Sequence, residues 1–237
     1  MGDLYLKPQR GSSNLLRGLS PNIWSQSPLT QLSVGGIDEG FGIIDDFLTF
    51  DDENKWVLTQ ASAGTAALDV AAKGGVLLLD SASSTNNQGV QIQLGGAAGA
   101  SSFIANANSK IYYEARVKIA DIGSTTCQMF AGLAIVDTSV FASAANSTAN
   151  HIGFEAINTT AMGIHSEKAG SRSSTAAVHT VADDAYVKLG FVVDGLTKIT
   201  PYVNGVAKDA ITTNIPIVAL TPSFVCHSSG TTDPILH

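Results

Sequence analysis

The stretch AYVKLGFVVDGLTKITPYVNGV, residues 185–206, decides the fold class. Apolar side chains stand at every second position from Val187 to Val193, which is the pattern of a strand with one apolar face. An Asp-Gly pair at 194–195 and an Asn-Gly pair at 204–205 each close a strand-like run, and both pairs tolerate the positive φ of tight hairpin turns. The stretch therefore predicts consecutive antiparallel strands.

Similar strand-like runs, separated by turn residues, recur from residue 43 onward. The clearest is KIYYEARVKIA, residues 110–120, in which the odd-numbered positions from Ile111 to Ile119 are apolar and most even-numbered positions are polar. We expect the odd-numbered side chains to face the core, because the side chains of a strand alternate between its two faces. The number and spacing of the runs predict an all-β chain folded as a two-sheet antiparallel sandwich.

Composition and charge exclude several classes of protein. The chain has 237 residues, 44% of them hydrophobic and 14% charged, which suits one large β-sandwich. No window of about eighteen residues is continuously apolar, and the first residues lack the pattern of a signal peptide, so we expect a soluble protein that is not secreted by that route. The formal net charge of −7, with scattered basic residues, argues against a nucleic-acid-coating surface. We expect no nucleic-acid partner and no membrane partner.

Residues 1–42 differ from the rest of the chain and predict an extended N-terminal arm ahead of a sandwich at 43–237. The segment contains Pro8, Pro21 and Pro28 and several glycines, and it follows neither the strand nor the helix period. It also carries more leucine, isoleucine and aromatic residues than a disordered linker needs. Because ordering each residue costs about 1 to 2 kcal/mol, such an arm becomes fixed only where its apolar side chains are buried on a surface.

The cysteines and the acidic clusters predict no metal site and no cofactor. Cys127 and Cys226 lie far from any CxxC spacing. Two alternatives are open: buried free thiols, which we favour, or one disulfide if their strands adjoin. The acidic residues at 45–46 and 51–53 lack the spacing of a calcium loop, and we assign them to turns and strand ends.

No catalytic constellation is evident. A glycosidase needs two carboxylates flanking one sugar bond. Glu114, Glu155 and Glu167 each appear without a second acid close by in the sequence, and we assign them structural or solvated roles. The histidines show no HxH, HExxH or shared-face spacing, and no GxSxG motif is present. The histidines are His151, His165, His179, His227 and His237.

Several of these runs together resemble a known family. The runs are DDFLTFDDENKWVLT (45–59), GGVLLLDS (74–81), NNQGVQIQL (86–94), KIYYEARVKIA (110–120), FAGLAIVD (130–137) and the two turn-closed runs at 185–206. In these runs the chain resembles the concanavalin A-like jelly-roll proteins encoded among tailed-phage head genes, and within them the capsid decoration, or cement, proteins. The resemblance spans about residues 43–227 and consists of strands and turns, without a catalytic motif.

The resemblance implies a structural virion protein on the outer surface of a phage capsid, and not an enzyme. In that family the arm lies along the capsid and the jelly roll projects outward, so the expected partner is the major capsid protein, with a homotrimer favoured and a dimer next. The residues expected to contact the capsid are Leu4, Tyr5, Leu6, Lys7, Arg10, Leu15, Leu16, Arg17, Ile23 and Trp24.

Two alternatives stay open. One is a carbohydrate-binding, lectin-like module that uses the loops at 95–102 and 139–150. The other is a glycoside hydrolase, because laminarinase-like glycosidases share the fold and an EARVK-like strand, here at 114–118. Their acidic catalytic strand, Glu-x-Asp-x-x-Glu, has no match in this sequence.

Overall fold

The computed structural model describes most of the chain, and every structural statement below concerns the described part. The described residues are 19–25, 27, 42–52, 54–72, 74–95, 103–122, 127–141, 150–230 and 233–237. Of the residues expected to contact a capsid, only Ile23 and Trp24 fall within these ranges. None of the described helices is long and apolar enough to cross a membrane.

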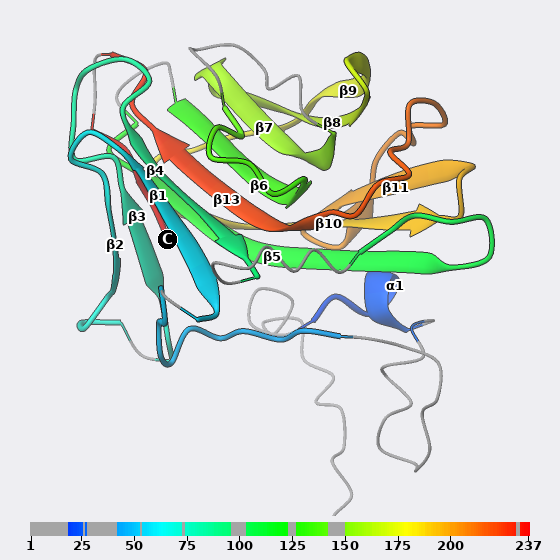
Figure 1. Ribbon diagram of the computed structural model, residues 1–237, viewed down its shortest axis with the longest axis horizontal. Coiled ribbons are helices and arrows are strands. Elements are labelled where there is room, and N and C mark those ends of the chain that lie inside the picture. Colours follow the sequence, from blue (N-terminus) through cyan, green and yellow to red (C-terminus); the bar gives the residue numbers. More distant parts are fainter. Residues whose placement is uncertain are drawn as a thin grey trace, which may run out of the picture.

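The described residues form two antiparallel sheets of seven strands each, packed face to face (Figure 1). In spatial order, sheet A contains β1 (Trp56–Ala61), β4 (Gly89–Leu94), β13 (Thr221–His227), β6 (Cys127–Ala134), β7 (His151–Thr159), β8 (Ala161–Lys168) and β9 (Ser171–Thr180). Sheet B contains β12 (Val206–Ala207), β11 (Lys198–Val203), β10 (Ala185–Asp194), β5 (Lys110–Ala120), β14 (Ile235–Leu236), β3 (Leu77–Asp80) and β2 (Thr65–Leu68). The predicted all-β jelly-roll sandwich is confirmed.

The hairpins of the deciding stretch form as antiparallel pairs, with one difference. β10 pairs with β11 and β11 pairs with β12, as expected. Asn204 and Gly205 form a two-residue turn, with φ of 50° and 76°. Asp194, however, pairs with Lys198, so three residues make the first turn, and of these only Gly195 has positive φ. The predicted two-residue turn at 194–195 is therefore wrong, because Asp194 still belongs to the strand.

The core lies between the sheets and follows the predicted alternation. Ile111, Tyr113, Val117 and Ile119 of β5 are buried, and Phe191 of β10 is fully buried beside them. Partners from sheet A, such as the inward side chains of β7 and β4, complete one continuous apolar cluster. Burial of such side chains is worth roughly 1.5 to 3 kcal/mol each, so the core is the main source of the stability of the sandwich.

Cys226 is buried in this core. Its Sγ donates a hydrogen bond to the Pro234 carbonyl at 3.3 Å. The side chain of Cys127 lies outside the described residues. Whether the two cysteines form the disulfide named as the alternative therefore stays a prediction.

A second, smaller apolar cluster lies on the outer face of sheet A. Phe130 of β6 packs there with Val225 of β13 and with Phe141 from the segment that follows β6. Two amide side chains of β4 hold this segment: Gln93 donates to the Ile135 carbonyl at 2.9 Å, and Gln91 donates to the Asp137 carbonyl. Part of the outer face of sheet A is therefore covered by its own chain.

The close approach of β6 and β7 requires glycine on both strands. Gly132 pairs with Gly153, and a Cβ at Gly132 would lie 2.3 Å from the Ile152 carbonyl oxygen. A Cβ at Gly153 would lie 2.5 Å from the Phe130 ring, which covers it. The absence of a side chain at Gly153 thus lets the Phe130 ring pack directly against β7.

Gly132→Ala is expected to lower the free energy of unfolding by about 2 to 3 kcal/mol, because the new methyl group meets main-chain atoms that cannot move independently. Urea unfolding at neutral pH measures the change. Ser174→Ala, at an exposed position of β9, serves as the control and should change stability by less than about 0.5 kcal/mol. Equal stabilities of the two variants would contradict this account of β6 and β7.

Candidate functional site

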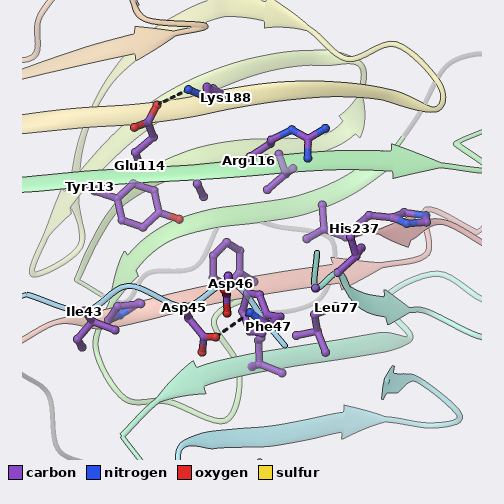
Figure 2. Close-up of a pocket in the computed structure, with 18 of the residues that line it drawn as sticks. Ile43, Asp45, Asp46, Phe47, Leu77, Tyr113, Glu114, Arg116, Lys188 and His237 are labelled. Atoms are coloured by element: carbon purple, nitrogen blue, oxygen red, sulfur yellow. Dashed lines mark hydrogen bonds and ion pairs between the residues drawn. The ribbon is translucent and has the colours of Figure 1, made fainter. Parts of the chain in front are cut away.

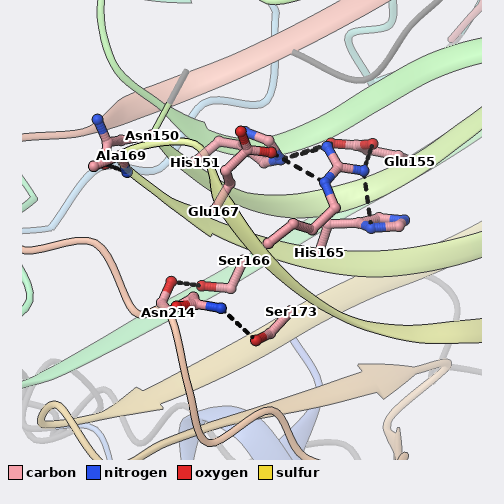
Figure 3. Close-up of polar contacts among 10 residues, drawn as sticks. Asn150, His151, Glu155, His165, Ser166, Glu167, Ala169, Ser173 and Asn214 are labelled. Carbon is pink, nitrogen blue, oxygen red and sulfur yellow. Dashed lines mark hydrogen bonds and ion pairs between the residues drawn. The ribbon is translucent and has the colours of Figure 1, made fainter. Parts of the chain in front are cut away.

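Five polar side chains gather on the outer face of sheet A, across β7, β8 and β9 (Figure 3). Ile152 and Phe154 of β7 point into the core, so the alternate residues His151 and Glu155 point outward. The register pairs His151 with Glu167 of β8, and Glu167 in turn with Arg172 of β9. His165 shares the face, because it lies two residues before Glu167. We call the set the Arg172 cluster; its members are His151, Glu155, His165, Glu167 and Arg172.

The Arg172 guanidinium joins the two carboxylates. Its Nη1 and Nη2 donate to the two oxygens of Glu155 at 3.2 and 3.3 Å, and its Nε donates to Glu167 Oε2 at 3.0 Å. His151 Nε2 lies 2.7 Å from the Glu155 Oε1 atom. β7 and β9, which flank β8, are thus connected by the contact of Arg172 with Glu155. The contact has the bidentate geometry that suits guanidinium and carboxylate.

The cluster is largely removed from water. The side chains of His151, Glu155 and Glu167 are at most 4% exposed, whereas the Arg172 side chain is 20% exposed and His165 is half-buried. Buried charges are tolerated only when they are paired and hydrogen-bonded. Arg172 and His165 are therefore the members that a ligand can reach.

Glu155 is held ionised. Burial acts to raise the pKa of its carboxyl group, but the hydrogen bond from His151 and the electrostatic attraction of the neighbouring basic side chains outweigh it, so the pKa is lowered. A carboxylate in this state serves as a hydrogen-bond acceptor or a base. It does not serve as a general acid, which needs a raised pKa.

His165 is uncharged at neutral pH. Burial lowers its pKa to about 4, with Arg172 and His151 adding to the effect and Glu155 partly opposing it. The geometry agrees, because Arg172 Nη1 lies 3.2 Å from His165 Nδ1 and a guanidinium can only donate. Nδ1 is therefore the acceptor, and the ring proton sits on Nε2, where it is available to an acceptor on a ligand.

Sequence reasoning missed this site. It left Glu155 and Glu167 without a second acid nearby and gave the histidines no shared face, and both interpretations are wrong. The cause is the register of the β7–β8 hairpin, which pairs His151 with Glu167, 16 positions further along the chain. The signal was present, because counting alternate positions along two strands joined by a tight turn places both acids and both histidines on one side.

The apolar side of the site is supplied by Phe130. Its ring meets the His151 ring edge to face, with 5.7 Å between centroids. The covered part of sheet A, over β4, β13 and β6, thus ends where the polar part begins. The described residues contain no group of three or more His, Cys, Asp or Glu side chains that could hold a metal ion, and we place no metal in the site.

Glu114, to which the sequence analysis gave a structural or solvated role, contacts Ser20 and Trp24, in the middle of the segment expected to be an arm. It lies on the outer face of sheet B under α1 (Pro21–Trp24), which Figure 1 shows beneath β5. Its carboxylate accepts hydrogen bonds from the Ser20 main-chain N–H at 2.9 Å, from the Ser20 hydroxyl, and from Trp24 Nε1 at 2.7 Å. Lys188 Nζ lies 3.6 Å from the same carboxylate.

Ile23 and Trp24, two residues assigned to capsid contact, lie against the sandwich itself. Ile23 is 2% exposed, and it packs over Gly190 of β10, where a Cβ would come within 2.5 Å of its Cδ1 atom. Trp24 stacks on Tyr112 with 5.9 Å between ring centroids. The other residues assigned to the arm contact lie outside the described residues.

Comparisons with known proteins support the fold and no closer relationship. No protein-family model matches the chain, and no curated protein matches it in sequence. Its fold is similar to that of an endo-β-1,4-glucuronan lyase from the fungus Trichoderma reesei (10% identity, 81% of this chain and 90% of that chain, TM-score 0.54). It is also similar to a β-glucanase from Bacillus licheniformis (13% identity, 81% and 92%, TM-score 0.53) and to a protein of unknown function from Shewanella oneidensis MR-1 (12% identity, 89% and 92%, TM-score 0.55).

These structures contradict the prediction that the chain is not an enzyme. Two of the three are enzymes by name, and both belong to the concanavalin A-like jelly-roll architecture seen here. The exclusion rested on acids that appeared isolated in the sequence, and the fold brings two of them to one guanidinium group. A capsid decoration role, by contrast, finds no support or contradiction in these neighbours.

Acidification is expected to destabilise the protein through His165. Its folded pKa of about 4 lies below the ordinary histidine pKa of 6.5, so between these two pH values the unfolded chain binds a proton that the folded protein does not. Stability is therefore lost as the pH falls from 7 to 5, by about 1 to 2 kcal/mol from this residue. Urea unfolding at both pH values measures the loss, which should be smaller in His165→Gln. An equal loss in both proteins would contradict the assigned burial of His165.

Glu114→Ala is expected to release α1 and to lower the free energy of unfolding by about 3 kcal/mol, because it removes three hydrogen bonds and leaves Lys188 without its carboxylate. The emission of Trp24 should shift to longer wavelength. Asp209→Ala, an exposed acid whose main-chain carbonyl accepts from Thr175, is the control. Unchanged tryptophan emission in Glu114→Ala would show that Glu114 does not hold α1.

Proposed function

We propose that the protein binds polysaccharide on the outer face of sheet A, with the Arg172 cluster as the polar centre of the site. The observation that carries the proposal is a guanidinium, 20% exposed, held between two buried carboxylates and two histidines on that face. Sugar hydroxyl groups both donate and accept hydrogen bonds. His165, which a ligand can reach, can donate its Nε2–H to a sugar oxygen, and the Arg172 guanidinium places a positive charge beside it.

The arrangement favours binding over acid catalysis. Glu155 is held ionised and shares its oxygens between Arg172 and His151. A ligand hydroxyl can add to such a network without a proton transfer, because each charged group already has a partner. Phe130, which is fully buried, packs edge to face against the His151 ring and holds it in place.

The named activities of the structural neighbours agree with this choice of ligand. The lyase acts on β-1,4-glucuronan and the glucanase on β-glucan, according to their names. At 10 to 13% identity these likenesses concern the fold, and their substrates enter here only as probes to be tested. Mixed-linkage β-glucan and β-1,4-glucuronan are therefore the first polysaccharides to try.

Affinity electrophoresis in gels containing either polysaccharide tests the proposal. The wild-type protein should be retarded, and the Ser174→Trp variant should not. Ser174 is exposed on β9 and pairs with His165 of β8, so the indole would cover the site without removing any charge. Arg172→Lys should weaken retardation at least about tenfold, since lysine keeps the charge and loses the bidentate contact. Lys198→Trp, which places the same indole at an exposed position of sheet B, is the matched control.

Retardation of Ser174→Trp equal to that of wild type would place any polysaccharide site elsewhere. If neither polysaccharide retards the wild-type protein, a panel of other glycans is tested at the same concentrations. No retardation by any of them would contradict the proposal.

A second candidate is that the site also acts on the polysaccharide it binds. The observation in its favour is that Glu155 and Glu167 contact one guanidinium, so their carboxylates lie within the roughly 5 to 10 Å that separates glycosidase pairs. Incubation with each polysaccharide, followed by assays for reducing ends and for unsaturated products, tests it. Product formation that Glu155→Gln abolishes supports the candidate, and no product with a polysaccharide that binds would contradict it.

Capsid binding through residues 1–42, as a homotrimer or dimer, stays a prediction, as does a place on the outer surface of a virion. Deletion of residues 1–19, which leaves the contact of Ser20 with Glu114 in place, separates it from polysaccharide binding. The deletion should abolish binding to capsid shells and leave polysaccharide retardation unchanged.

A further inference from the structure

A cavity of about 510 Å³ lies beside β5, between the two sheets (Figure 2). The inward-facing residues of β5, from Ile111 to Val117, line one side, and Leu77 of β3 and Phe47 line the other. Apolar side chains of β4, β6 and β13, from sheet A, form its floor. The cavity is therefore a part of the inter-sheet space that the core side chains do not fill.

The cavity opens on the outer face of sheet B. The main chain of residues 46–47 lies against the turn before β3, where a Cβ at Gly75 would come within 1.9 Å of the Asp46 carbonyl oxygen. Arg116 of β5, which is exposed on the outer face, also lines the cavity. The space between β5 and residues 46–47 is therefore accessible to a small molecule from this face.

A buried hydroxyl group points into the cavity. Tyr113 stacks on Phe191, with 4.8 Å between ring centroids, and in Figure 2 its hydroxyl extends from β5 into the open space. The Tyr113 Oη atom is buried and has no hydrogen-bond partner among the described residues. Burial raises the pKa of this hydroxyl, so it stays protonated and can donate. An unsatisfied buried polar group is costly and therefore indicates a missing partner.

The surroundings of the hydroxyl suit an organic molecule better than water. A buried water needs about three polar contacts. The cavity-lining side chains of β3, β4, β6 and β13 are apolar. The Asp45 carboxylate, on the side opposite β5, already accepts hydrogen bonds from the Phe47 N–H and from Trp56 Nε1, both at 2.9 Å, and lies 2.8 Å from Lys55 Nζ. A water beside Tyr113 would therefore lack further partners among these groups.

We infer that the cavity binds a small apolar molecule that carries a hydrogen-bond acceptor for the Tyr113 hydroxyl. The volume lies within the range of roughly 300 to 1,000 Å³ that is usual for ligand pockets, and apolar walls with few polar groups are typical of such sites. A hydrocarbon of the same shape would leave the hydroxyl unpaired, so the acceptor sets the specificity. The Arg172 cluster lies on the outer face of the other sheet, and the two sites are separate.

NMR titration of the whole protein with acetophenone and, separately, with ethylbenzene tests the inference. The two molecules are similar in size, and only acetophenone has a carbonyl oxygen that can accept from Tyr113. Both should bind, because both are apolar enough to enter the cavity, and both should raise the midpoint of thermal unfolding. The measured quantity is the ratio of their dissociation constants.

Tyr113→Phe should change this ratio at least about tenfold against acetophenone and leave the affinity for ethylbenzene the same or higher. The variant keeps the ring that stacks on Phe191, and its ligand-free unfolding midpoint should not fall, because the hydroxyl has no partner to lose. Tyr202→Phe, on β11 and outside the cavity lining, is the matched control and should keep the wild-type ratio. Ala115→Leu, which fills part of the cavity, should weaken binding of both molecules at least about fivefold.

Three results would overturn the inference. These are no binding of either molecule at about 1 mM, an unchanged ratio in Tyr113→Phe, and a lower unfolding midpoint of ligand-free Tyr113→Phe, which would show that the hydroxyl already has a partner such as water. Arg172→Lys should leave the affinity for acetophenone unchanged. Weaker acetophenone binding in that variant would place the molecule on sheet A and would also contradict the inference.

Discussion

The contact of Arg172 with Glu155 and Glu167 is the constraint on which the candidate site depends. Two carboxylates buried at the surface of one sheet repel each other and lose hydration, and a single guanidinium offsets both costs. Arg172 can do so only because the register aligns β7, β8 and β9 so that all three side chains share one face. The contacts of Arg172 therefore form only in this register of β7, β8 and β9, and the site depends on the same register.

The two outer faces of the sandwich are used differently. The outer face of sheet B carries α1, held by Glu114, which is a middle part of the segment predicted to be a capsid-binding arm. The outer face of sheet A is covered over β4, β13 and β6 and polar over β7, β8 and β9. The candidate site that the structure describes is therefore on sheet A and not on the arm. It also explains why Ile23 and Trp24 behave as part of the domain.

The sequence predicted the fold because alternation is a local property. The buried series from Ile111 to Ile119 and the Asn204-Gly205 turn both follow from neighbouring residues, and both are confirmed. The turn after Asp194 failed by one residue, since strand ends depend on the partner strand.

The site could not be read in the same way, because it depends on which strands are neighbours. Glu155, Glu167 and Arg172 are unremarkable in the sequence and acquire their roles only through cross-strand pairing. Their apparent isolation also led to the incorrect exclusion of an enzyme.

Titration of isotopically labelled protein with a mixed-linkage β-glucan oligosaccharide, followed by amide chemical shifts, tests the central claim most directly. The account predicts that the perturbed amides lie in β7, β8 and β9 around residues 151–155, 163–167 and 172–174, with β5 and β10 unaffected. Shifts confined to sheet B, or to the loops at the ends of the sandwich, would contradict the assignment of the Arg172 cluster as the polysaccharide site.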